Sequence, residues 1–387
     1  STAYSYTRLN GDPAVDVPPT PLKVNTPVGA ITIPPNTYQA GTRDNYNWTV
    51  EAKQPLYTGG ALSANYRASR LGVDIAKVEE SRAVLDLIEE VKIAYFNILK
   101  ASRLLAVAGQ SLDLLRAHRD TAQSFYDAGV IPKNDLLAAE VELANGTQSL
   151  VRAENGLEMA KSRFNTVLRR EIGTPVAIED LLSDRPFGMT LDACIGSALE
   201  NRPEIRLYAC RLDQARSMVD LARSEYYPNV SLVGNYSKYG DTPGVSGSPY
   251  QDQENWYVMA MANWNVWEWG RTRNRVDAVV SLENRAADAL THIRDRIVLE
   301  VKDAFLYLHE AQKQVQVARK AIEQAEENFR INTERYREQV GTATEVLDAQ
   351  TLLTKVRSDG DNALGDYSIS RARLERAMGI DVRGGTP

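Results

Sequence analysis

The stretch EVKDAFLYLH at residues 300–309 decides the architecture of this chain, because EVKIAYFNIL at residues 90–99 repeats it. The offset is 300 minus 90, or 210 residues, and it holds without a gap on both sides. The matched positions include Gly60 and Gly270, Tyr126 and Tyr336, Val130 and Val340, Asp135 and Glu345, Leu137 and Leu347, Ala139 and Ala349, and Arg163 and Arg373. One register kept over this length predicts two copies of one structural unit.

Each copy contains a long helical run, predicted from Gly60 to Ala128 and from Gly270 to Glu338. Apolar residues in both runs follow the four-three spacing of a coiled-coil seam. The seam residues are Val84, Ile88, Val91, Tyr95, Ile98, Leu105 and Leu112 in the first run, and Val298, Val301, Phe305, Leu308 and Val315 in the second. At 1.5 Å per residue each helix would be about 100 Å long and would need neighbours along its length.

A short break separates each long run from a shorter helix, predicted at 134–169 and 343–378, so each copy is expected to form an antiparallel helical hairpin. The breaks lie in SFYDAGVIPKNDLLAAE at residues 124–140 and in ERYREQVGTATEVLDAQ at residues 334–350. Gly341 is interpreted as the C-cap of the second long helix. That role leaves open why two carboxylates, Glu345 and Asp348, follow the turn one helical turn apart.

Two stretches ahead of the long helices alternate apolar and polar residues, which predicts β-strands. They are YNWTVEAKQPLY at 46–57 and NWYVMAMANWNVW at 255–267, with earlier partners at 1–9 and 229–239. Two β-hairpins are therefore expected. A soluble half-buried sheet alternates in the same way, but Trp48, Trp256 and Trp264 on the apolar faces favour the aromatic girdle of a membrane barrel.

Four strands cannot close a barrel, since even small membrane barrels need about eight, and open sheet edges are not tolerated in lipid. Several chains must therefore share one barrel, and the strands by themselves allow two, three or more copies. The residues from Asn10 to Asp44 hold seven of the sixteen prolines and are expected to form a long external loop. The predicted fold class is mainly α with a membrane β-barrel part.

Composition excludes several classes of partner. A net charge of -6, with basic residues interspersed among acidic ones, argues against nucleic acid. No apolar run approaches the roughly 20 residues of a membrane-spanning helix. Cys194 and Cys210 fall in no metal-binding spacing, so neither a metal nor a cofactor is expected. They are two unpaired thiols or, in an oxidising compartment, one local disulfide.

Four motifs resemble those of the TolC-type outer-membrane factor family. They are QPLYTGGAL at 54–62, YYPNVSLVGNYS at 226–237, VWEWGRTRN at 266–274 and VGTATEVLDAQ at 340–350. The resemblance covers essentially the whole chain and implies a homotrimer with a shared twelve-stranded outer-membrane barrel and a long helical tunnel in the periplasm. Two short helices, near Leu191–Glu200 and from about Pro203, precede the second copy, whereas nothing equivalent precedes Ser1. A longer intact chain is therefore expected.

The family resemblance also implies a passive exit channel for small molecules, metal ions or secreted proteins, in the outer membrane of a Gram-negative-type cell. Its implied partners are a periplasmic adaptor (membrane fusion) protein, an inner-membrane pump and outer-membrane lipid. The implied residues of the periplasmic constriction are Glu345, Asp348, Asp135 and Tyr336, and those of the adaptor-docking tips are Gly129, Val130, Val340, Gly341 and Thr342. Where some members place a basic residue that locks the tip, this sequence has Gly341.

The carboxylates of Glu345 and Asp348 can be interpreted in two ways, one structural and one functional. Glu345 and Asp348 are solvated acids on a helix face, or else three-fold symmetry gathers six carboxylates around a narrow axis. There like charges would raise their pKa values and attract cations.

Two other classes of function compete with a channel. An enzyme finds no support, because His118, His292 and His309 lie on the long helices without a nucleophile or a metal-ligand cluster. A structural coiled-coil protein of the envelope would also use heptads and turns, but it has no need of tryptophans on one strand face. The chain is predicted to divide into six segments. The first copy has a β-hairpin with its loop at 1–57 and a helical hairpin at 58–176. A linker with equatorial helices follows at 177–227, and the second copy has a β-hairpin at 228–267, a helical hairpin at 268–380 and a tail at 381–387.

Overall fold

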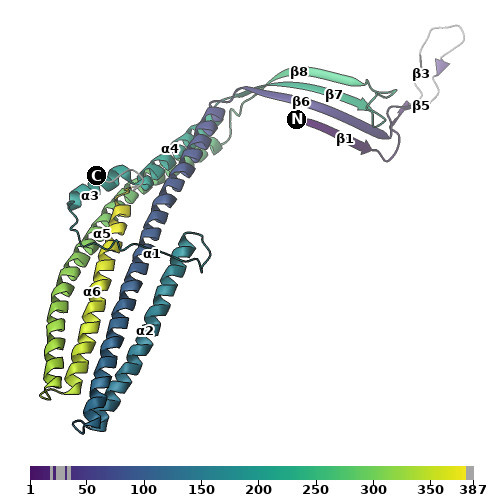
Figure 1. Cartoon of the computed structure of the whole chain (residues 1–387). Coiled ribbons are helices and arrows are strands. Elements are labelled where there is room, and N and C mark those ends of the chain that lie inside the picture. Colours follow the sequence, from purple (N-terminus) through teal and green to yellow (C-terminus); the bar gives the residue numbers. More distant parts are fainter. Residues whose placement is uncertain (18–20, 23–30, 33–35, 381–387) are drawn as a thin grey trace. The chain divides into compact units, whose positions relative to one another are not determined.

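A computed structural model describes residues 1–17, 21–22, 31–32 and 36–380 of the chain (Figure 1). Its elements belong to two compact units. The first unit consists of Ser1–Arg70 with Gln214–Asn284 and contains the main β-sheet. The second consists of Leu71–Asp213 with the described residues from Arg285 onward, and it contains the helical hairpins.

The main sheet has four antiparallel strands in the order β1, β6, β7, β8. Their bounds are β1 (Thr2–Arg8), β6 (Asp44–Tyr57), β7 (Asn229–Gly240) and β8 (Glu254–Asn263). Both predicted hairpins are confirmed, and pairing of β6 with β7 joins them into one sheet whose edges are β1 and β8. The prediction that the last strand continues to residue 267 is wrong. Its partner β7 begins directly after Pro228, which has no N–H to extend the ladder.

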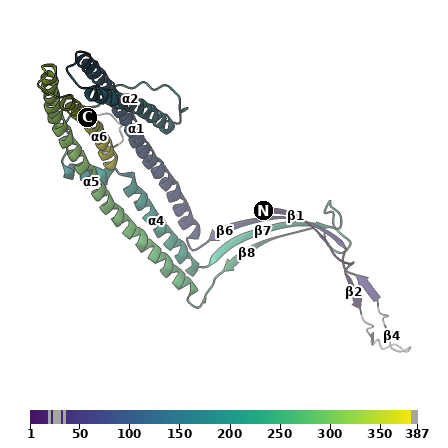
Figure 2. The same cartoon turned by 90° about the horizontal axis from the view of Figure 1, so that it is seen from below.

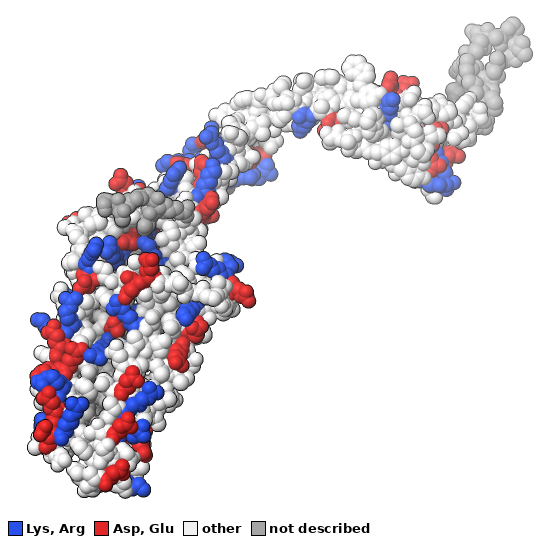
Figure 3. Space-filling model, viewed as in Figure 1, with Lys and Arg blue, Asp and Glu red and all other residues white. Residues whose placement is uncertain are grey.

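The strand register places Trp48, Tyr236 and Trp256 on one face of the main sheet, whereas Tyr239 and Tyr257 lie on the other. Tyr236 lies opposite Trp256, and the Trp48 ring packs edge-on against Tyr236 with 6.2 Å between ring centroids. Trp48 and Trp256 lie near the end of the sheet away from the helices, whereas Trp264 follows the other end of β8. Charged side chains are sparse over the strands in the space-filling view (Figure 3). The sheet therefore presents an apolar, aromatic-bordered face.

The predicted long loop contains two short ladders in its described part. β2 (Ala14–Val17) pairs with β5 (Asn36–Gln39), and β3 (Pro21–Leu22) pairs with β4 (Ile31–Thr32). The prediction of one irregular loop therefore misses these strands. Residues 18–20, 23–30 and 33–35 of that loop lie outside the described residues.

Four helices confirm the repeat. α1 (Ala61–Asp127) and α5 (Arg271–Arg337) each contain 67 residues, and α2 (Lys133–Val167) and α6 (Ala343–Ala377) each contain 35. The starts differ by 271 minus 61 and by 343 minus 133, both 210. In each copy the shorter helix runs back alongside the longer one (Figures 1 and 2). Within the described residues, no helix is both long and apolar enough to cross a membrane.

The predicted seams supply the helical core. Ile98 and Leu112 of α1, and Val301 and Leu308 of α5, are almost completely buried. In the first copy, Ile98 forms a cluster with Ala94 and with Phe164 of α2. Burial of side chains along the seam is the main favourable free-energy contribution available to helices of this length.

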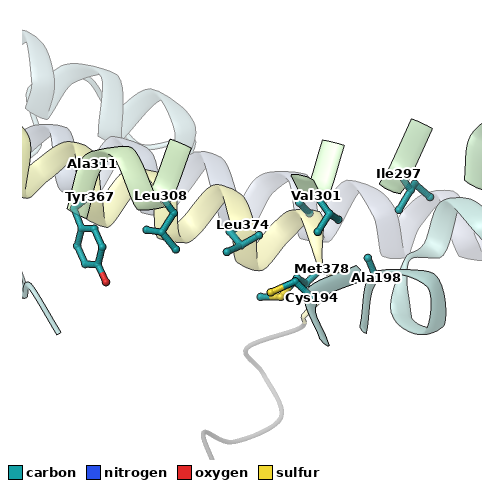
Figure 4. Close-up of a cluster of buried hydrophobic side chains, with 10 residues drawn as sticks. Cys194, Ala198, Ile297, Val301, Leu308, Ala311, Tyr367, Leu374 and Met378 are labelled. Carbon is teal, nitrogen blue, oxygen red and sulfur yellow. The ribbon is translucent and has the colours of Figure 1, made fainter. Parts of the chain in front are cut away.

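Two shorter helices, α3 (Leu191–Asn201) and α4 (Pro203–Arg223), lie between the copies, as predicted. Thr190 caps α3 by accepting a hydrogen bond from the Ala193 N–H, and Pro203 occupies the first position of α4, where its missing N–H costs nothing. Cys194 of α3 is buried with Met378 and with α5 residues in one apolar cluster (Figure 4). Both cysteines are free thiols.

Candidate functional site at the hairpin turns

The turn of the first helical hairpin is a Schellman motif. The Gly129 N–H donates to the Tyr126 carbonyl over 2.9 Å, and the Val130 N–H donates to the Phe125 carbonyl over 2.9 Å. Gly129 has a φ of 71°, which is the left-handed residue that this motif requires. Val130 follows it and is exposed. The predicted tip residues of this copy therefore lie in a closed, hydrogen-bonded turn.

The turn of the second hairpin has the same bonds but a different residue at its centre. The Gln339 N–H donates to the Tyr336 carbonyl and the Val340 N–H to the Arg335 carbonyl. Gln339 takes the left-handed conformation, with a φ of 61°. The prediction that Gly341 is the C-cap is therefore wrong by position. Glycine fits closely at 341, since a Cβ there would make tight contacts of 3.1 Å with the Arg335 Cβ and 3.2 Å with the Tyr336 backbone nitrogen.

Glu345 closes a capping box at the start of α6. Its Oε2 accepts from the Thr342 N–H over 3.1 Å, and the Thr342 Oγ1 accepts from the Glu345 N–H over 3.2 Å. The guanidinium of Arg335 lies 3.9 Å from the same carboxylate. One predicted constriction carboxylate thus already satisfies backbone donors of its own helix. The first copy has no side-chain cap, because Pro132 occupies the N-cap position of α2.

Tyr336 lies at the centre of a buried cluster near the tip. It is only 5% exposed, and its ring lies 5.4 Å from Phe125 and 5.3 Å from His118 between ring centroids. Burial raises the pKa of Tyr336, and the charge of Asp135 raises it further. Among the described residues, neither the Tyr336 hydroxyl nor the His118 Nε2 has a hydrogen-bond partner.

The four predicted constriction residues are not all alike in their surroundings. Tyr336 of α5 and Asp135 of α2 come from different hairpins and interact electrostatically, so the fold brings these two together. Asp348 is exposed on α6, one turn beyond the capping Glu345. Val340 and Thr342 are exposed at the tip, while Gly341 is half-buried between them. The predicted residues therefore form a tip region with one buried and several accessible members.

His118 and Phe125 are parts of this region that sequence reasoning missed. Both are on α1, seven residues apart, and therefore on one side of the helix. Both contact Tyr336 from the other hairpin. The available signal was the i, i+7 spacing, which places both rings on one face of the helix close to the predicted turn. Treating the histidines only as possible catalytic groups hid it.

A four-stranded sheet with open edges and an apolar aromatic face, joined in sequence to long helical hairpins, is typical of channel-forming outer-membrane proteins. The sequence profile of the outer membrane efflux protein family matches residues 25–168 and 194–380. The chain belongs to this family, whose members are outer-membrane channels rather than enzymes. The chain is therefore a protein of the outer membrane of Gram-negative bacteria.

Individual relatives are similar to most of this chain at low identity. The toluene efflux pump outer membrane protein TtgF of Pseudomonas putida is 25% identical over 372 residues, covering 92% of this chain and 75% of that protein. Nodulation protein T of Rhizobium leguminosarum bv. trifolii is 21% identical over 328 residues, covering 83% and 68%. The Campylobacter jejuni CmeC outer membrane channel is similar in structure, with a TM-score of 0.73, 16% identity and coverage of 98% and 78%. The predicted fold class, mainly α with a β part, is confirmed.

Proposed function

We propose that three copies of this chain form the outer-membrane exit channel of a tripartite efflux or type I secretion system. The observation that carries this proposal is the four-stranded sheet with two open edges, β1 and β8, and an apolar aromatic face. Unpaired strand edges are costly in lipid, and pairing β1 of one copy with β8 of the next removes them. Each chain would then contribute four strands to a twelve-stranded barrel, with the helical hairpins projecting into the periplasm.

The partners of the proposed channel follow from the tips and from the relatives. TtgF is named as the outer-membrane protein of an efflux pump, and such a protein works with other pump components. On this chain, Val130 and Val340 are exposed apolar side chains at the two hairpin turns. Exposed apolar residues on closed, well-ordered turns suit docking of a periplasmic adaptor protein, which in turn would connect to an inner-membrane pump.

Closure of the tunnel is assigned to the carboxylates near the tip. In a trimer, Glu345 and Asp348 would contribute six carboxylates, and Asp135 would lie behind them next to Tyr336. Because Glu345 is held by its capping box, Asp348 is the more available of the two for binding cations. Such acidic rings select cations and bind multivalent ones more strongly than monovalent ones.

Single-channel recording in planar bilayers tests the constriction. Asp348→Asn should reduce cation selectivity and weaken block by multivalent cations. Glu345→Gln should do the same to a smaller extent, because glutamine preserves the capping box while removing the charge. The matched control is Glu323→Gln, which removes one exposed charge from α5 away from the turn.

The results separate the parts of the proposal. Unchanged selectivity and block in the Asp348→Asn, Glu345→Gln double variant would remove the constriction assignment. Absence of any conductance from the folded, membrane-inserted protein would instead favour a structural coiled-coil protein of the envelope.

A further inference from the structure

The junction between β8 and α5 exposes a run of four large apolar side chains within six residues. We name this run the junction patch and define it as Trp264, Val266, Trp267 and Trp269. Each member is more than half exposed, and Trp269, at 88%, is the most exposed large hydrophobic side chain of the described residues. Trp267 and Trp269 pack edge to face, with 5.8 Å between ring centroids. A patch of this kind marks contact with a partner or with a membrane.

The repeat shows that the turn itself does not require a tryptophan at position 269. Trp269 and its counterpart 210 residues earlier, Gly59, occupy the same left-handed turn, with φ of 50° and 60°. Glycine is required in the first copy, since a Cβ at Gly59 would lie 2.6 Å from the Ser224 carbonyl oxygen. The second copy instead holds a tryptophan in a conformation that is unfavourable for any residue with a Cβ. The side chain of Trp269 must therefore have a use outside the chain's own core.

Charge is distributed unequally around the first turn of α5. Arg271 and Arg275 line a pocket of about 470 Å³ together with Asn263 and Asn265, on the polar side of the strand pattern. Arg273 lies two residues from each, which is close to half a turn at 3.6 residues per turn, so it lies on the opposite side of the helix. Arg273 is not one of the residues that line the pocket. The side chain of Arg273 is 82% exposed and its ion-pair partner, Asp277, lies 3.9 Å away.

We propose that the junction patch and Arg273 form a membrane-interface site that binds the headgroups of anionic glycerophospholipids. Tryptophan is enriched at the level of lipid headgroups, where its apolar ring and polar N–H are both satisfied. Arg273 lies three residues past Gly270, or about 5 Å along the helix, and the headgroup region is about 5–8 Å thick per leaflet. At that depth the guanidinium can donate two parallel hydrogen bonds to the oxygens of a lipid phosphate. The inference rests on the proposed channel function, in which the strands cross the membrane.

Tryptophan quenching by brominated lipid tests this site in the full chain reconstituted into vesicles. The vesicles mix phosphatidylcholine with phosphatidylglycerol, and either lipid carries the bromine. The difference in fluorescence between the unaltered chain and Trp269→Phe isolates the signal of Trp269. We expect both brominated lipids to quench that signal, with phosphatidylglycerol favoured. We also expect Arg273→Gln to reduce the preference about five-fold, the effect of one basic residue at an anionic surface.

Two further variants keep the test decisive. Arg294→Gln, 294 minus 273 or 21 residues further along α5, should leave the preference unchanged. Trp269→Gly restores the residue of the first copy, suits the left-handed turn and protects the experiment against a misfolded Phe variant. An unquenched Trp269 would overturn the proposal and assign the junction patch to a second copy of the chain. A preference that survives Arg273→Gln would overturn the headgroup site. Conductance recorded from the same vesicles separates these results from failure of the channel function.

Discussion

At the scale of single residues, the two hairpin turns have the same backbone conformation but differ in its free-energy cost. Gln339 occupies the left-handed position that Gly129 occupies in the first copy. Glycine accepts positive φ freely, whereas a residue with a Cβ does not. We therefore expect Gln339→Gly to stabilise the second turn by about 0.5–1 kcal/mol and Gly129→Ala to destabilise the first by about 1 kcal/mol or more. Hydrogen exchange of the turn amides measures both, and slower exchange in Gly129→Ala would contradict the assignment.

His118 makes the tip sensitive to acid. Burial lowers the pKa of His118 from its usual 6.5, so the imidazole is neutral in the folded protein at neutral pH. A histidine with a lowered folded pKa stabilises the fold fully above its unfolded pKa. That stability is lost as the pH falls from about 6.5 toward the folded pKa. The His118 ring contacts the ring of Tyr336. Within the described residues, the Tyr336 hydroxyl has no hydrogen-bond partner. The nearby acidic group is Asp135, whose charge raises the pKa of Tyr336.

The expected result is faster exchange at the hairpin turns at pH 5.5 than at pH 7.5, after correction for the intrinsic exchange rate. His118→Phe keeps a ring against Tyr336 and removes the titrating group, so the variant should show a smaller dependence on pH. An equal dependence in both proteins would assign the effect to the carboxylates instead.

At the scale of elements, an ion network connects four helices of the second unit. Arg202, 4% exposed, donates to Glu204 over 2.9 Å and 3.0 Å and to Glu300 over 2.9 Å. Arg376 donates to Glu204 over 2.9 Å and to Glu300 over 3.1 Å, and it also bonds Asp86 of α1. The network therefore fixes the start of α4 against α1, α5 and the end of α6.

Removing one partner from such a network leaves a buried charge uncompensated. We expect Arg202→Met to destabilise the protein by about 3 kcal/mol, the lower end for a broken buried pair, because Arg376 still contacts Glu204. Arg211→Met breaks a surface pair with Glu79 and should cost less than about 1 kcal/mol. Thermal unfolding in detergent compares the two variants, and equal losses would show that the network is not worth more than a surface pair.

Element type was predictable from sequence, whereas element ends depended on contacts. The predicted ends of the four long helices agree with the observed ends to within two residues. This is because an apolar seam and the turn residues after it can both be recognised locally in the sequence. The end of β8 at Asn263 depended on Pro228, which directly precedes the partner strand β7. The left-handed residue Gln339 was overlooked because a glycine at 341 lies close to it. The contacts of His118 with the other hairpin required the packing of α1 against α5. The end of β8 and the contacts of His118 both depend on residues that are distant in the sequence.

At the scale of the whole molecule, the sheet edges and the strand length limit the assembly. Trp256 and Trp264 are eight residues apart, or about 26 Å along an extended chain. A strand tilt of about 40° reduces this to about 20 Å along the membrane normal, which is comparable with the roughly 25 Å apolar band of a membrane barrel. That length suits tryptophans at both membrane interfaces. It does not by itself say how many chains surround the barrel.

The proposed number of three copies agrees with the requirement for an open channel. Two chains would give eight strands, and the interior of an eight-stranded barrel is filled by side chains. Three chains give twelve strands, the next number available to a symmetric ring of four-stranded units, and the first with room for a passage. Light scattering of the detergent-extracted protein, corrected for bound detergent, should therefore give three times 43.0 kDa, or 129 kDa. A mass of two chains would be incompatible with conduction through the barrel, and the channel would then have to be rejected together with the trimer.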